Sequence, residues 1–237
     1  MAAACLLWTG QVLAADSTNS VAKATSASGQ APQPAIVYKF TKGSVAAARV
    51  TGGSRGSGDA AVTLDVLTPD ETGLTTQEQP SLFWYQSKPA KARFELTIME
   101  EDAVKPVFET NFERASKAGI QRLRLADQGV KLAVGVEYKW VVALVTDPNN
   151  RSSDLVASGF IKRVEASPEL KVKLKDAAPS AVPAIYAEAG IWHDALGSLT
   201  DLIEAQPADK ALVAERADLL RQVGLKAAAA DSVASSK

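Results

Sequence analysis

The sequence contains very little cysteine and histidine, with one of each in 237 residues, Cys5 and His193. A single cysteine excludes a disulfide within the chain, and one cysteine with one histidine cannot supply the ligands of a structural zinc site. The sequence has 26 basic and 27 acidic residues, so neither sign of charge is in excess. Without a basic surplus to displace counterions from phosphates, we expect no nucleic-acid partner. After the N-terminal stretch, no apolar run approaches the roughly 20 residues that a membrane-spanning helix needs.

A short apolar stretch opens the sequence. Residues 1–15 (MAAACLLWTGQVLAA) end in small residues before a polar run that begins at Asp16. This pattern is typical of a signal peptide and its cleavage site, although no Lys or Arg precedes the apolar residues. We therefore predict export to the periplasm or the exterior. The alternatives are a disordered apolar N-terminus and a lipoprotein anchored through Cys5.

Residues 16–60 are poor in large apolar side chains and rich in Ser, Ala, Thr and Gly. Such a segment cannot bury enough surface to offset the entropy of ordering, so we predict a flexible spacer. Within it, residues 36–40 (IVYKF) favour a short strand. The glycines at 52–58 indicate a loop, which lacks the Gly-Lys-Ser/Thr ending of a phosphate-binding loop.

Alternation of apolar and polar residues begins near residue 61 and predicts a mainly β fold. The expected strands are 61–67, 81–86, 93–99, 106–112, 119–126, 138–145 and 155–164. Seven strands separated by turn signals at intervals of about ten residues are typical of an antiparallel two-sheet sandwich. We place this domain at residues 61–167.

One local motif refines the expected sandwich. The segment 132–140 (LAVGVEYKW) resembles the stretch before strand F of fibronectin type III domains. The resemblance implies that Leu132 fills the core, that Gly135 turns the chain, and that the Tyr138 hydroxyl bonds back to the backbone as a tyrosine corner. It implies an immunoglobulin- or fibronectin-III-like fold and no particular function.

Helical periodicity replaces the alternation after residue 168. Residues 182–205 predict two helices with a turn at Gly190, and residues 209–223 predict a third helix that ends at Gly224. One set of residues resembles the spacing of a tetratricopeptide repeat: Tyr186, Gly190, Trp192, Ala195 and Pro207. We predict a helical hairpin with a third helix over 168–225, which docks on the sandwich or caps a partner, and a disordered tail over 226–237.

Several segments together resemble an uncharacterised bacterial family, the domain of unknown function 928. They are residues 53–56 (GSRG), 73–80 (GLTTQEQP), 83–85 (FWY), 138–140 (YKW), 147–148 (DP), 151–152 (RS), 186–192 (YAEAGIW) and 194–196 (DAL). The resemblance covers residues 50 to 225. It implies no activity, so no functional residue is carried over from it.

The most polar loop is 147–154 (DPNNRSSD). Its oxygens suit Ca²⁺, but the spacing, the central Gly and the final Glu of an EF-hand are absent, and the same residues suit any tight turn. Together with the helix start at 192–193, this loop supplies our candidate partner-binding residues. They are Asp147, Asn149, Asn150, Arg151, Trp192 and His193.

Three further groups of residues offer candidate sites. The acids at 100–102 (EED) suggest a carboxylate pair or a solvated turn, and His193 suggests a general base or a packed side chain. The aromatic residues at 83–85 with Trp140 suggest a sugar-stacking platform or a core.

From these residues we predict no catalytic site, no cofactor and no metal. The leading hypothesis is a non-enzymatic interaction module of the bacterial envelope with a protein partner. A carbohydrate- or peptidoglycan-binding module and a hydrolase of unrecognised type are the alternatives, and the oligomeric state stays open.

Overall fold

The structure is a computed structural model that describes residues 35–40, 49–53, 62–100 and 103–234. The expected signal peptide at 1–15 lies outside the described residues, as do most of the expected spacer and the glycines at 54–58.

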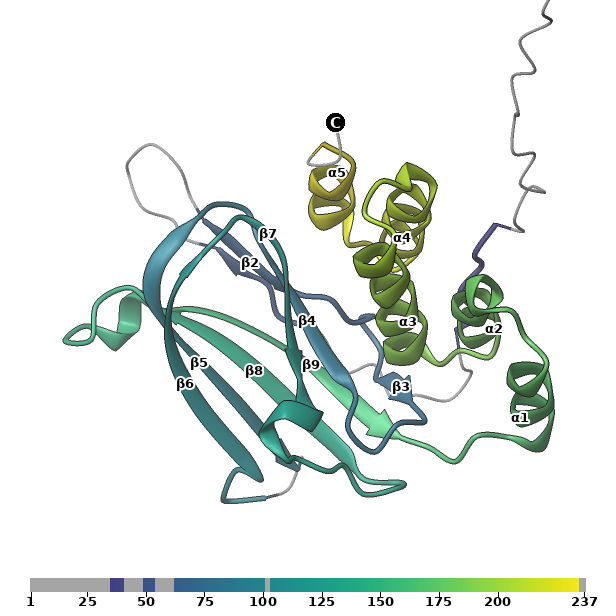
Figure 1. The fold of residues 1–237 in the computed structure, drawn as a ribbon. Helices are drawn as coiled ribbons and strands as arrows, with labels where there is room; N and C mark the ends of the chain where they lie inside the picture. Colours follow the sequence, from purple (N-terminus) through teal and green to yellow (C-terminus); the bar gives the residue numbers. More distant parts are fainter. Residues whose placement is uncertain (1–34, 41–48, 54–61, 101–102, 235–237) are drawn as a thin grey trace, which may run out of the picture. The chain divides into compact units, whose positions relative to one another are not determined.

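Two β-sheets form the body of the described chain (Figure 1). The first has the strand order β1-β2-β4-β7, with β1 Gly52–Gly53, β2 Thr63–Val66, β4 Ser81–Gln86 and β7 Gly119–Arg124. The second has the order β3-β9-β8-β5-β6, with β3 Gly73–Thr75, β5 Ala90–Glu100, β6 Phe108–Ser116, β8 Glu137–Val145 and β9 Leu155–Arg163. All seven strands expected from the alternation are present, so the predicted sandwich is confirmed.

The alternation in β4 explains how the layers are stacked. Leu82 and Trp84 belong to the core between the two sheets, and Phe83 and Tyr85 belong to a second core on the opposite face. Side chains of consecutive strand residues point to opposite faces, so a strand that is apolar throughout is covered on both sides. The second core is filled by helices, so the first sheet lies between the helices and the other sheet (Figure 1).

Two short strands were missing from the sequence prediction. β3 pairs with β9 in parallel, Gly73 opposite Ile161, so the prediction of a wholly antiparallel sandwich is wrong at this edge. β1 pairs with β2, and Val50 exchanges two backbone hydrogen bonds with Ser158 of β9. Residues 49–53 therefore pair with strands of both sheets, which is incompatible with a flexible spacer at these positions.

The motif at 132–140 has the geometry expected of it. Leu132 is 1% exposed and lies in the core between the sheets. Gly135 has φ +81°, a conformation that side chains disfavour. The Tyr138 hydroxyl accepts a 3.1 Å hydrogen bond from the backbone N–H of Ala133. The bond joins β8 to the loop that precedes it.

The C-terminal part is helical. Its helices are α1 Pro168–Lys175, α2 Val182–Glu188, α3 Trp192–Ala205, α4 Lys210–Gln222 and α5 Lys226–Ala234. Gly190 (φ +75°) and Gly224 (φ +81°) turn the chain after α2 and α4, as the sequence predicted. No helix in the described ranges is long and apolar enough to cross a membrane.

Helix α1 was missed, although its start carries a recognisable signal. The Ser167 side chain accepts a 3.1 Å hydrogen bond from the backbone of Leu170, and Pro168 occupies the first helical position. A serine cap followed by proline is a standard helix start.

Two predictions about ordering are wrong. Residues 226–234 form α5 instead of a disordered tail, because the run at 227–230 is all alanine, the best helix former, and buries Ala228 and Ala229. Residues 36–40 do not form the expected strand. They are not a flexible spacer either, because Ile36 and Tyr38 are buried in the core with the helices.

Candidate functional site

The first turn of α3 packs against the end of the sandwich. Trp192, His193 and Asp194 are 0%, 2% and 0% exposed. The indole Nε1 of Trp192 donates a 2.8 Å hydrogen bond to the carbonyl of Leu67, and its ring meets Tyr38 edge-on at 5.1 Å. The sharp turn at Gly190 directs this helix start inward.

Asp194 ties α3 to the end of β3. Its carboxylate accepts hydrogen bonds from Thr75 Oγ1 at 2.5 Å, from the backbone N–H of Thr76 at 2.9 Å, and from Thr76 Oγ1 at 2.5 Å. Burial raises the pKa of this carboxyl, and these three donors act in the opposite direction by stabilising the charge. The carboxylate also lies in the first turn of the helix, where the helix dipole favours negative charge.

His193, the residue before Asp194, is also buried. Neither ring nitrogen has a hydrogen-bond partner among the described residues. Burial lowers the pKa of His193 to about 3, so the ring is neutral at physiological pH. Gly73 lies against it, since a Cβ at this position would stand 2.6 Å from Nε2 and 2.7 Å from Thr68 Oγ1.

These positions decide two of the predictions. Trp192 and His193 were expected at a partner-binding surface, and that is wrong because both side chains are enclosed where the helices meet the sandwich. A general base must reach the proton that it removes. His193 is 2% exposed, and its ring packs between the helices and the sandwich.

The sugar-stacking platform is wrong for the same reason. Phe83, Trp84, Tyr85 and Trp140 are all at most 5% exposed. Phe83 and Tyr85 lie under the helices, and Trp84 and Trp140 lie between the sheets. A stacking platform needs ring faces that a ligand can reach, and these four rings present none.

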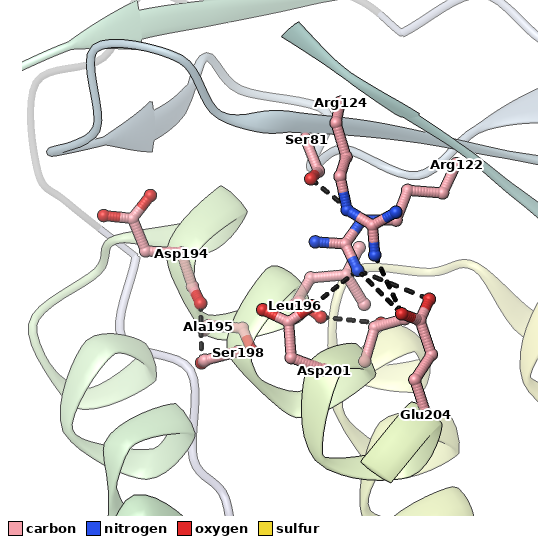
Figure 2. Close-up of polar contacts among 10 residues, drawn as sticks. Ser81, Arg122, Arg124, Asp194, Ala195, Leu196, Ser198, Asp201 and Glu204 are labelled. Atoms are coloured by element: carbon pink, nitrogen blue, oxygen red, sulfur yellow. Dashed lines mark hydrogen bonds and ion pairs between the residues drawn. The ribbon is translucent and has the colours of Figure 1, made fainter. Parts of the chain in front are cut away.

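A network of charged residues fastens the side of α3 to β7, and Figure 2 shows Arg122 and Arg124 reaching Asp201 and Glu204. Arg122 Nη1 is 2.5 Å from Asp201 Oδ1 and 3.3 Å from Glu204 Oε1, and Arg124 Nη2 is 2.8 Å from Glu204 Oε2. Arg122 Nε also donates to Ser81 Oγ at 2.9 Å. The network therefore serves to join the helices to the sheet.

The loop between β8 and β9 is exposed, as expected for a binding surface. Asp147, Asn149, Asn150 and Arg151 are all exposed, which keeps them available as candidate partner-binding residues. The Asp147 carboxylate accepts a 2.9 Å hydrogen bond from the backbone N–H of Asn149. Ser152 Oγ donates to Asn150 Oδ1 at 2.6 Å.

Arg151 anchors this loop to the sheet. Its guanidinium bonds both carboxylate oxygens of Glu95 on β5, at 3.2 and 2.6 Å, and Asp154 Oδ2 at 2.6 Å. The bond from Arg151 lowers the pKa of the Glu95 carboxyl. A bidentate pair of this kind has a defined geometry and joins the loop to β5. Within the described ranges, no three His, Cys, Asp or Glu side chains are grouped as metal ligands.

Residues 35–40 pack against α2 and α4, an arrangement that the sequence did not predict. Ile36 and Tyr38 of this segment are buried. Gln222 of α4 and Ala187 of α2 bond the backbone of this segment. The alternation of Ile36 and Tyr38 with exposed Val37 and Lys39 was the available signal, but the surrounding polar composition outweighed it.

Over residues 50–233, the sequence matches the model of a family described as Domain of Unknown Function (DUF928). None of the curated proteins matches the chain. The matched range contains the sandwich and the helices packed on it, and it leaves out the segment 35–40.

Proposed function

The chain belongs to the DUF928 family, whose description assigns no function, and from that premise we propose that it is a non-enzymatic interaction module of the bacterial envelope. Its partner is a protein, and its location is the periplasm or the exterior. We further propose that the sandwich is of the immunoglobulin or fibronectin III type and that the helices are tetratricopeptide-like. The tyrosine corner at Tyr138 supports the first likeness, and the helix pair turned at Gly190 supports the second.

The observation that carries this proposal is the ordered, exposed loop at 147–154. Its polar side chains at Asp147, Asn149 and Asn150 face solvent, while the Arg151–Glu95 pair holds its backbone against the sheet. A loop that is ordered in advance loses little entropy on binding, which favours recognition of a protein surface. The buried His193 and Asp194 support the same proposal, because they are engaged in joining helices to sheet.

The test is capture of partners from the native envelope by the full-length protein with a C-terminal tag. The loop variant carries Asp147→Ala, Asn149→Ala and Asn150→Ala, and it keeps Arg151 so that the anchor to Glu95 remains. The matched control carries Glu109→Ala and Asn111→Ala, two exposed residues of β6. We expect the wild type and the control to capture the same protein, and the loop variant to capture at least about tenfold less, equivalent to 1.4 kcal/mol.

Equal capture by all three proteins would contradict the proposal that the loop binds the partner. Truncation of the helices is unsuitable as a test, because removing residues after Lys175 would expose Phe83 and Tyr85, which the helices cover. Export has its own test, since cell fractionation and the N-terminal mass of the mature protein show whether residues 1–15 are removed. A full-length cytoplasmic protein would contradict the proposed location.

A further inference from the structure

We draw no further inference here: the strongest candidate, the edge strand β6, which carries the partly buried rings of Phe108 and Phe112 and pairs only with β5 within the described ranges, carries no proposal because nothing in the structure shows what covers it.

Discussion

The indole N–H of Trp192 donates a 2.8 Å hydrogen bond to the carbonyl of Leu67, and both residues are fully buried. The bond joins the start of α3 to the residue that follows β2, across 125 residues of sequence. Around it lie Tyr38 on one side and the apolar residues Phe83 and Leu196 of the same core. The helices and the sandwich therefore belong to one compact unit of the described chain.

Trp192→Phe is expected to lower the free energy of unfolding by about 1–3 kcal/mol. The phenyl ring keeps much of the packing but leaves the Leu67 carbonyl without its donor in a buried position. Urea unfolding of the full-length protein measures the change. Val172→Ala, at an exposed residue of α1, is the matched control and is expected to change stability by less than about 0.5 kcal/mol.

Gly73→Ala is expected to destabilise the protein by about 1–3 kcal/mol, because the added Cβ would stand 2.6 Å from His193 Nε2 and 2.7 Å from Thr68 Oγ1. His193→Ala should relieve part of this clash. A double-mutant cycle in urea is expected to give a coupling energy of at least about 0.5 kcal/mol between the two positions. If the two stability changes are strictly additive, the added methyl group does not contact the His193 ring.

The stability of the protein is expected to fall in mild acid because of His193. Its pKa is about 3 in the fold and 6.5 in the unfolded chain, so the unfolded state binds the additional proton between these values. Stability from this group is therefore complete above pH 6.5 and declines as the pH falls from 6.5 toward 3. The slope reaches at most about 1.4 kcal/mol per pH unit.

His193→Leu isolates this contribution. The ring nitrogens have no partners among the described residues, so an apolar side chain of similar size should cost little at pH 7.5. Urea unfolding at pH 7.5 and pH 5 should show a smaller loss in the variant than in the wild type. Asp194 acts with the opposite sign, since its raised pKa favours the fold as the pH falls, and it is unchanged in both proteins. Equal losses would contradict the buried, neutral state of His193.

The ion pairs between β7 and α3 are expected to be unequal in their effect on stability. Arg122 bonds Ser81, Asp201 and Glu204, lies over the ring of Phe83 at 5.3 Å, and is 15% exposed in its side chain. Arg122→Ala should cost about 1–3 kcal/mol. Asp201→Ala, at a side chain that is 59% exposed, should cost less than about 1 kcal/mol.

Thermal unfolding of both variants at low and high salt separates packing from charge. The effect of Asp201→Ala should shrink as salt screens the exposed pair. Most of the effect of Arg122→Ala should persist, because it comes from buried contacts. The same salt dependence in both variants would show that the network acts only as a surface ion pair.

The periodic parts of this chain were predictable from its sequence. The two-residue alternation located seven strands, and the helical spacing with Gly190 and Gly224 located α2, α3 and α4. The motif around Tyr138 led to the hydrogen bond with Ala133. These features depend on neighbours within a few residues, whose identities are visible along the chain.

The sequence by itself therefore determined the sandwich, the helical end and the family, since each rests on local periodicity or on matched segments. Only the tertiary structure decided that the helices cover Phe83 and Tyr85, that Trp192 and His193 are enclosed, and that Ile36 and Tyr38 pack in the core with the helices. Burial depends on which surfaces meet across more than a hundred residues. An aromatic residue or a histidine has the same one-letter code on a binding surface and in a core, and only the contacts made in three dimensions distinguish the two.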